Sequence, residues 1–383
     1  MQIFLLLIDY SLPLVMAYLV LQKGSLSIVY VPFFYFMYSM LEKSKIIPIY
    51  HLILVLLLVY YAFYNLPFLK YNIFFVILIL FFTYNLQVIT DFKLFRLRII
   101  SLYWIFTIIA LAPEICKRYS RDKILKELSI SSFLILFFFI INTILSTVLG
   151  YYPDNHYGFT SGISFGHIGI SEYSILPLAV YLVFRNGIVE KKIIYLLVGF
   201  VGLFLVMLTL RRTAMALSLI ACVAVFVELL NFKQIRQFAI YLLVIGIGGT
   251  IVLKVTGFSD QLMERIEKRN LQDKDLEEEG RFIEFGLVYK DLFVYYDYDP
   301  IFGYGPLMSW GNYGKRMFEN RPLHSDITYL IHGFGFFGFM LYVFMAYLVF
   351  YRAWGRCRNR NDKIIFSFLF FYFIVFFLIG SSK

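Results

Sequence analysis

Long apolar runs follow one another along nearly the whole chain, and a single long hydrophilic stretch interrupts them. The runs are continuous rather than alternating between apolar and polar residues, which favours helices over the strands of a β-barrel. An α-helix needs about 20 apolar residues to cross a bilayer. We therefore predict membrane-spanning helices at residues 2–21, 26–41, 47–64, 71–90, 99–115, 126–149, 168–186, 193–210, 213–230, 238–256, 327–350 and 364–380.

The first of these runs resembles a secretory signal peptide in its position. It has neither a basic start nor a small-residue cleavage site, so we expect it to remain in the protein as a helix. The hydrophilic stretch, residues 257–326, divides the chain into three parts. Residues 1–256 are predicted to hold the first ten helices with short loops, 257–326 a large and partly helical loop, and 327–383 the last helices.

The basic residues between the runs predict which loops face the cytoplasm, because short cytoplasmic loops of membrane proteins are rich in Lys and Arg. Residues 351–363, for example, carry five bases and one acid. The other loops predicted to be cytoplasmic contain Lys117, Arg118, Arg121 and Lys123, then Arg185, Lys191 and Lys192, then Lys233 and Arg236. Residues 150–167, the pair Arg211–Arg212 and residues 257–326 then all lie on the opposite side.

One basic loop disagrees with this topology. Lys93, Arg96 and Arg98 would lie outside if residues 71–90 and 99–115 both spanned the membrane. Either one of these runs does not cross, or the rule fails locally. The predicted fold is thus an all-α polytopic membrane protein of eleven or twelve helices with one large extracytoplasmic loop, and the side of the N-terminus stays open.

Composition supports a membrane protein and excludes other classes. The 383 residues are 61% hydrophobic and 16% charged, whereas soluble domains are about 45–50% apolar and about 25% charged. The net charge of +10 does not indicate nucleic-acid binding, because residues 257–326 are net acidic and the excess of bases lies in short loops. The three cysteines are far apart in sequence and support neither a disulfide framework nor a zinc site.

Two adjacent arginines interrupt an apolar stretch at Arg211–Arg212. A guanidinium at membrane depth costs at least about 2.5–3.5 kcal/mol. One interpretation is a tight external turn whose arginines extend to the lipid headgroups. The other is an anion site, because arginine binds phosphate through a planar fork of donors.

The hydrophilic stretch holds three further candidates. Gly280–Arg281 opens an amphipathic helix predicted to run to Pro300, on which Arg281 could also pair with Glu284 or Asp291 on a solvated face. The sequence PIFGYG at residues 300–305 has two glycines that allow a sharp turn or a close backbone approach. His324 is a candidate proton carrier that Ser325 or Asp326 could orient, although a single loop histidine is more often an incidental surface residue.

The order of these features is more specific than any one of them. An Arg-Arg-Thr turn precedes a long loop that contains Gly-Arg, then PIFGYG, then His-Ser-Asp, and then a helix with glycines at 333, 335 and 338. Over residues 200–350 this order resembles the O-antigen polymerase and O-antigen ligase superfamily of bacterial envelopes. Arg212 occupies the place of the family's arginine before Thr213, and Arg281 that of its loop arginine. The family's His-Asn pair is His324-Ser325 here, so Asp326 is a substitute candidate for the orienting residue.

The resemblance implies a metal-independent glycosyltransferase with no cofactor, located in the bacterial inner membrane with its active site facing the periplasm. The donor would be a glycan on undecaprenyl diphosphate. The implied catalytic residues are Arg212 and Arg281, which would neutralise the diphosphate, and His324, which would take the acceptor's proton. As substrate-binding candidates we add Arg211 and Asp326, and also Tyr304, Arg316 and Arg321 because they lie in the same hydrophilic stretch.

Three functions remain in competition. A polymerase, which we prefer, joins one lipid-linked repeat unit to another, with a chain-length regulator and a flippase as further partners. A ligase transfers the glycan to lipid A-core. A flippase or transporter would carry charged residues inside several helices, whereas nearly all charges in this chain lie at the ends of the apolar runs or in loops.

Overall fold

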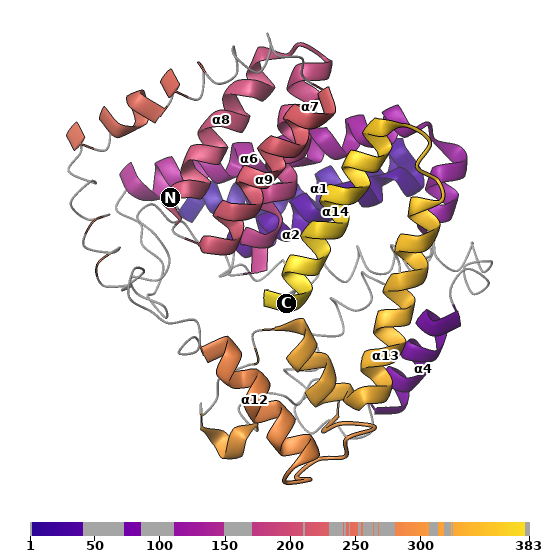
Figure 1. Ribbon diagram of the computed structural model, residues 1–383. Helices are drawn as coiled ribbons and strands as arrows, with labels where there is room; N and C mark the ends of the chain where they lie inside the picture. The colour runs from indigo at the N-terminus through magenta and orange to yellow at the C-terminus, as the bar shows by residue number, and fades with distance from the viewer. Residues whose placement is uncertain are drawn as a thin grey trace. The chain divides into compact units, whose positions relative to one another are not determined.

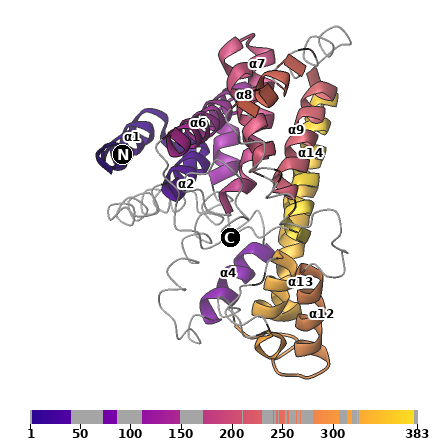
Figure 2. The same ribbon diagram turned by 90° about the vertical axis from the view of Figure 1, so that its left-hand side faces the viewer.

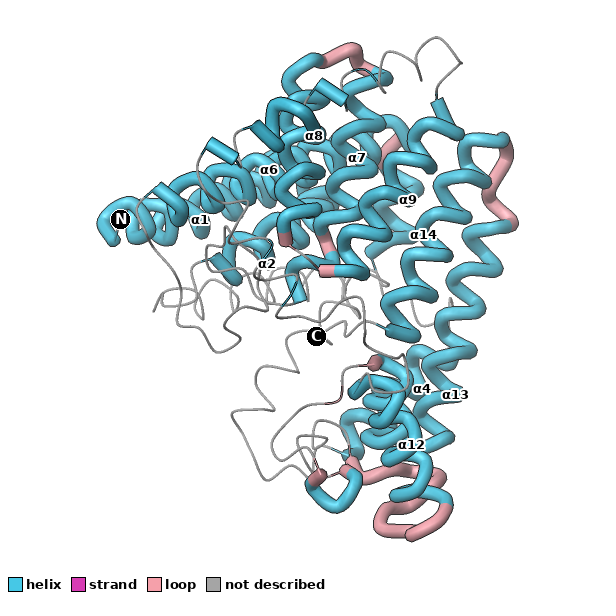
Figure 3. Tube along the Cα trace, turned by 60° about the vertical axis from the view of Figure 1, so that its left-hand side comes forward, coloured by secondary structure: helices cyan, strands magenta, loops and turns pink. Residues whose placement is uncertain are grey.

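In the computed structural model, most of the described residues are helical (Figure 3). The described residues are 2–40, 73–85, 111–148, 171–209, 211–229, 280–305, 313–317, 323 and 325–379, with isolated positions between 240 and 267. Among them there is no strand, only one isolated bridge between Asp299 and Gly303. The prediction of helices rather than strands is therefore confirmed for these residues.

Five of the described helical segments are long and apolar enough to cross a membrane. They are Tyr10–Met37, Arg121–Leu145, Arg212–Leu229, Asp326–Trp354 and Arg360–Leu378. Two shorter apolar helices, Leu176–Val189 and Ile193–Leu208, accompany them. Because water-exposed helices of this length would not be apolar all round, the chain has the character of an all-α membrane protein.

The chain divides into two compact units, each built from two separate stretches of sequence. The first unit comprises residues 1–58 and 115–272, and the second comprises residues 59–114 and 273–383. The helices of the first unit are α1 (Gln2–Lys23), α2 (Val31–Met40), α6 (Arg121–Val148), α7 (Leu176–Val189), α8 (Ile193–Leu208) and α9 (Arg212–Leu229), with the 3₁₀ segments η1 (Gly24–Tyr30) and η5 (Ser171–Ser174).

Helix α7 lies at the centre of the first unit. It packs against α6, α8 and α9, which lie beside it in Figure 1, and most of its residues are buried. Glycines allow the close approach: a Cβ at Gly199 would lie 2.8 Å from the ring of Phe184, and one at Gly202 would lie 3.2 Å from Leu136. Small residues at such contacts are typical of helix packing in membranes, because attraction there depends on close van der Waals contact.

Two predicted helices of this unit begin differently from what the sequence indicated. The run 168–186 is not one helix: η5 ends at Ser174 and α7 starts at Leu176, with Pro177 in its first turn. Proline lacks an N–H and its ring clashes with the preceding turn, so the first turn of a helix is the position that accepts it most readily. The run 26–41 begins as the 3₁₀ segment η1 and becomes α-helical only from Val31.

Two ion pairs, one around the buried Glu228 and one around the partly buried Glu127, join helices of the first unit. The Nε of Arg185 in α7 lies 2.9 Å from Oε1 of Glu228 in α9, and the hydroxyl of Tyr181 donates to Oε2 of Glu228 at 2.6 Å. Lys23 and Tyr30 bind Glu127 of α6 in the same manner. Since a lone charge in an apolar interior is costly, each carboxylate is held by a cation and a tyrosine hydroxyl.

The second unit is built around the long helix α13. Its helices are α4 (Ile73–Asn85), α12 (Gly280–Phe293), α13 (Asp326–Trp354) and α14 (Arg360–Ile379), with the 3₁₀ segment η7 (Gly314–Arg316). Figure 2 shows α4 and α12 beside α13, and all three of the other helices contact it. Val288 and Leu292 of α12 form a buried cluster with Tyr313 and Leu323, which joins the hydrophilic stretch to α13.

The remaining predicted spans are described in part or not at all. The described part of residues 71–90 is α4, and residues 364–380 correspond to α14. Residues 47–64, most of 99–115, and most of 238–256 lie outside the described residues, as does the loop 150–167.

The buried pair between α7 and α9 generates a stability prediction. Removing one partner in Arg185→Met or Glu228→Met should cost about 3–5 kcal/mol, because the other charge is left buried and unpaired. The double variant should be less destabilised than either single variant, since no lone charge remains. Thermal unfolding of the detergent-purified protein measures this; a double variant at least as unstable as the two losses added together would contradict it.

Candidate functional site

The predicted site residues fall into two groups, one in each unit. Arg211 and Arg212 belong to the first unit, and Arg281, Tyr304, Arg316, Arg321, His324 and Asp326 to the second. Arg321 and His324 lie outside the described residues, and for Arg281 and Arg316 only the backbone is described.

The turn between α8 and α9 places the two arginines at a helix start. The hydroxyl of Thr209 donates to the carbonyl of Val206 at 2.6 Å and accepts the N–H of Arg211 at 3.3 Å, which closes the end of α8. The carbonyl of Arg211 then accepts the first hydrogen bond of α9, from Met215 at 2.9 Å. Arg211 is thus the N-cap residue of α9, and the exposed Arg212 is its first helical residue.

Tyr173 of η5 contacts this turn, a neighbour that the sequence did not indicate. The guanidinium carbon of Arg211 lies 4.7 Å from the centre of the buried Tyr173 ring. The Nε of Arg211 is itself buried and has no hydrogen-bond partner in the described part of the chain. This cation–π contact holds the guanidinium against the ring of Tyr173.

The start of α9 carries several hydrogen-bond donors. A helix start leaves N–H groups without intrahelical partners, and a usual N-cap side chain would accept from one of them. Arginine has no acceptor, so the N-cap side chain adds donors instead. The guanidinium of Arg211 and the partial positive charge of the helix start are suited to a phosphate or another anion, and Arg212 adds a second positive charge to the same turn.

In the second unit, α12 carries Arg281 in its first turn and buried acids along one face. The predicted solvated face is wrong for Glu284 and Asp291, which are 0% and 1% exposed. The helix also ends at Phe293 rather than near Pro300. The chain turns there because Tyr296 adopts a left-handed conformation, with φ of 55°, and Tyr295 donates back to the carbonyl of Lys290 at 2.7 Å.

The carboxylate of Asp291 holds the segment that follows the PIFGYG motif. Its Oδ2 accepts the N–H of Gly314 at 2.6 Å, and its buried Oδ1 has no hydrogen-bond partner in the described part of the chain. Burial raises the pKa of this carboxyl. The hydrogen bond from Gly314 and the charge of Lys315 lower the pKa, and the charge of Asp297 raises it, but burial prevails.

The PIFGYG motif and the glycines of α13 form one structure, a backbone clasp between residues 300–305 and 332–337. The N–H groups of Tyr304 and Gly305 donate to the carbonyls of His332 and Gly333, at 2.8 and 3.0 Å. The N–H groups of Phe336 and Phe337 donate to the carbonyls of Pro300 and Ile301, at 2.9 and 3.0 Å. In an unbroken helix, those last two N–H groups would have bonded to residues 332 and 333.

The clasp requires glycine at two positions. Gly335 has φ of 64° and ψ of −172°, a conformation that only glycine adopts readily. A Cβ on Gly335 would lie 2.2 Å from the carbonyl oxygen of Ile301, and a Cβ on Gly303 would lie 2.4 Å from the nitrogen of Gly335. The prediction that a glycine of PIFGYG allows a close backbone approach is confirmed for Gly303. The prediction of an unbroken helix over 327–350 is wrong at Gly335.

The clasp surrounds His332 with tyrosines. The His332 side chain is 0% exposed, and its ring centre lies 5.0 Å from that of Tyr298, 5.7 Å from Tyr304 and 6.2 Å from Tyr313. Neither ring nitrogen has a hydrogen-bond partner in the described part of the chain. No pattern in the sequence singles out His332, and only the folded clasp shows its enclosure.

Asp326 is the first residue of α13, preceded by Ser325 at the N-cap position. A carboxylate there interacts favourably with the helix dipole. Asp326 therefore stabilises the start of α13, in addition to the substrate-binding role predicted for it. Tyr304 is half-buried, and its ring contacts Tyr298 as well as His332, with 4.5 Å between the tyrosine ring centres. Tyr304 therefore lies against α13, the helix that Asp326 begins.

The clasp generates a prediction with a matched control. Gly335→Ala and Gly303→Ala should each destabilise the protein. The loss should exceed about 1–3 kcal/mol, the usual cost of backbone strain, because the added methyl group also clashes with backbone atoms. Gly286→Ala serves as the control. This helical glycine has open space around its Cβ position and should tolerate or gain stability from the change. Thermal unfolding in detergent compares them, and an unfolding midpoint of Gly335→Ala equal to that of the wild type would contradict the clasp.

The raised pKa of Asp291 generates a pH prediction. A carboxyl with a raised folded pKa binds a proton more tightly in the folded chain, so protonation favours the folded state. This stabilisation is complete below the ordinary pKa of aspartate and is lost as the pH rises through the raised pKa. We expect residues 313–317 to exchange amide hydrogens more slowly at mildly acidic pH, after correction for intrinsic rates. Asp291→Asn should flatten this profile, whereas Lys290→Gln, on the exposed face of α12, should leave it unchanged.

Comparisons with known proteins do not add to this description of the site. Neither protein-family models, nor characterised proteins, nor solved structures give a match to this chain. The function has therefore to be inferred from the residues themselves: an arginine pair at the start of α9 and a clasp that ties the hydrophilic stretch to α13.

Proposed function

We propose that this protein is a glycosyltransferase that polymerises a bacterial surface polysaccharide, as an O-antigen polymerase does. In this proposal it joins repeat units carried on undecaprenyl diphosphate at the periplasmic side of the inner membrane, without a metal ion. The observation that carries the proposal is the arginine pair at the start of α9, where Arg211 is held against Tyr173 with its Nε buried.

A diphosphate leaving group matches this arrangement of donors. When a glycosyl unit leaves a lipid diphosphate, negative charge increases on the phosphate oxygen that loses the sugar. Guanidinium groups and a helix start placed at that oxygen stabilise the charge as it develops. Arginine is suited to this task because its planar fork can bind two phosphate oxygens at once.

The position of the arginines along the helices supports an extracytoplasmic site. Arg212 and Glu228 lie near opposite ends of α9, about 24 Å apart along the axis, and Glu228 pairs with Arg185 close to the basic residues Lys191 and Lys192. By the positive-inside rule, the end with the lysines faces the cytoplasm. The end with Arg211 and Arg212 then faces the periplasm, where lipid-linked repeat units are polymerised.

The remaining chemistry is a proton transfer. In the proposed reaction, an acceptor sugar hydroxyl attacks the anomeric carbon of the donor, a new carbon–oxygen bond forms, and the bond to phosphate breaks. The acceptor hydroxyl loses its proton to His324, which precedes the start of α13 by two residues. The lipid diphosphate leaves with the bonding electron pair, bound by Arg212 and by Arg281 at the start of α12.

The test of the reaction type is a gel of surface glycans from a strain that lacks the gene. We expect core bearing a single repeat unit, with the ladder of longer chains missing. Bare core with long glycan still on the lipid carrier would make the protein a ligase. Lipid-linked units that stay on the cytoplasmic side would make it a flippase, and the proposed roles of Arg212, Arg281 and His324 would then be wrong.

The arginine site has its own prediction. Arg212→Ala should abolish the glycan ladder in the deletion strain, and Arg212→Lys should restore little of it, since lysine lacks the bidentate fork. Lys192→Ala, at the opposite end of α8, is the matched control and should leave the ladder intact. Immunoblots of the membrane fraction must show equal amounts of each variant. A normal ladder from Arg212→Ala would contradict a role for this residue at the diphosphate.

A further inference from the structure

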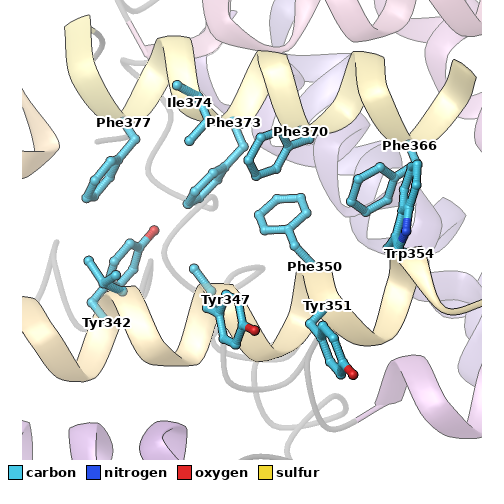
Figure 4. A pocket seen from close by; sticks show the side chains of 12 residues that line it. Tyr342, Tyr347, Phe350, Tyr351, Trp354, Phe366, Phe370, Phe373, Ile374 and Phe377 are labelled. Atoms are coloured by element: carbon cyan, nitrogen blue, oxygen red, sulfur yellow. The ribbon is translucent and has the colours of Figure 1, made fainter. Parts of the chain in front are cut away.

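A groove runs between α13 and α14, away from the clasp. Figure 4 shows aromatic side chains from both helices pointing into it. Its volume is about 400 Å³, within the range of pockets that hold small molecules. Its lining is almost entirely apolar, so it fits a hydrocarbon chain rather than a polar ligand.

The hollow has a local cause in the sequence of α13. Tyr342, Ala346, Phe350 and Trp354 follow one another at intervals of four residues and share one face of the helix. The ring of Phe350 packs 5.0 Å from Phe373 and 5.1 Å from Phe370, centre to centre, across to α14. Ala346 interrupts this column of rings with a methyl group, and the space that a large side chain would fill stays open.

The groove has the length of one lipid leaflet. From Tyr342 to Trp354 it follows α13 for about 18 Å, and half of a bilayer's hydrocarbon core is about 15 Å thick. Trp354 lies at the end nearest the turn that joins α13 to α14, where its ring contacts that of Phe366 at 5.2 Å. Tryptophan at such a position is typical of the boundary between hydrocarbon and headgroups.

That same end of the groove carries a cluster of bases. Arg352, Arg356, Arg358, Arg360 and Lys363 all lie within or next to the turn. The single acid among residues 351–363 is Asp362, and its carboxylate is used in capping α14: it accepts the N–H groups of Arg358 and Asn359, while the side chain of Asn359 accepts the N–H of Asp362. No described carboxylate lies within ion-pair distance of Arg352, Arg356 or Arg358.

We propose that the groove between α13 and α14 is a binding site for an anionic phospholipid, with one acyl chain beside Ala346 and the headgroup phosphate at Arg356 and Arg358. An undecaprenyl chain is much longer than this groove, and its diphosphate would meet the turn that the positive-inside rule assigns to the cytoplasmic side. The occupant is therefore a phospholipid of the cytoplasmic leaflet. This inference is independent of the proposed glycosyl transfer.

The experiment uses Trp354 as the reporter, because its ring lines the groove. The chain has three tryptophans, so Trp104→Phe and Trp310→Phe leave Trp354 alone. The full-length protein is placed in phosphatidylcholine vesicles that contain increasing amounts of a lipid whose acyl chains carry bromine, a contact quencher. The brominated lipid is phosphatidylglycerol in one series and phosphatidylcholine in the other. We expect brominated phosphatidylglycerol to be preferred at Trp354 by about tenfold over brominated phosphatidylcholine. Equal quenching by both lipids would overturn the proposal.

Two variants and a matched control separate the two parts of the site. Arg356→Gln with Arg358→Gln should bring the preference to within about twofold of unity. Ala346→Phe should fill the hollow and reduce quenching by both lipids while the basic end stays intact. Lys191→Gln with Lys192→Gln removes the same charge from another basic loop and should change nothing. Helical content measured by circular dichroism verifies that each variant is folded.

Each remaining outcome would contradict the proposal. A preference that survives loss of Arg356 and Arg358 would exclude the headgroup contact. Unchanged quenching in Ala346→Phe would exclude the hollow as the chain's position. Loss of the preference in the Lys191 and Lys192 control would indicate general surface charge rather than a site. Displacement of the brominated lipid by undecaprenyl phosphate at lower concentration than by unlabelled phosphatidylglycerol would identify a different occupant.

Discussion

Backbone hydrogen bonding in an apolar environment is the constraint on which the second unit depends. An N–H or carbonyl left without a partner there costs several kcal/mol, so a helix can be interrupted only where another segment replaces the lost bonds. Gly335 breaks α13, and residues 300–305 supply the replacement carbonyls and N–H groups. The clasp thereby joins a hydrophilic stretch to an apolar helix and positions Tyr298 and Tyr304 around His332.

The same intolerance of unpaired polar groups explains the charges of the first unit. Glu228 and Glu127 are held by a cation and a tyrosine hydroxyl near the ends of their helices. The start of α9 departs from this pattern: Arg211 keeps a buried Nε without a hydrogen-bond partner in the described part of the chain. Stable proteins rarely leave such a donor unused. A bound anion would accept a hydrogen bond from this Nε, and the proposed diphosphate site is therefore placed at the start of α9.

Helix α13 takes part in both the clasp and the proposed lipid site. Its first part contributes to the clasp beside the hydrophilic stretch, and its last part forms the apolar groove with α14. In the proposed topology these parts lie toward opposite faces of the membrane. A phospholipid in the groove would fix the pairing of α13 and α14, which otherwise depends on contacts between aromatic rings, such as that between Phe350 and Phe373.

The sequence by itself determined the class of protein, the positions of most described helices, and the residues around which a function can be argued. In a bilayer, only a helix gives a continuous apolar run all of its backbone hydrogen bonds within the same segment. Arg211–Arg212 stands out because charge inside such runs is costly. The sequence could not determine that Tyr173 stacks on Arg211, that Ala346 leaves a hollow, or that PIFGYG enters the break at Gly335. Apolar periodicity describes one helix at a time, whereas these features depend on contacts between segments far apart in the chain, which only the tertiary structure decides.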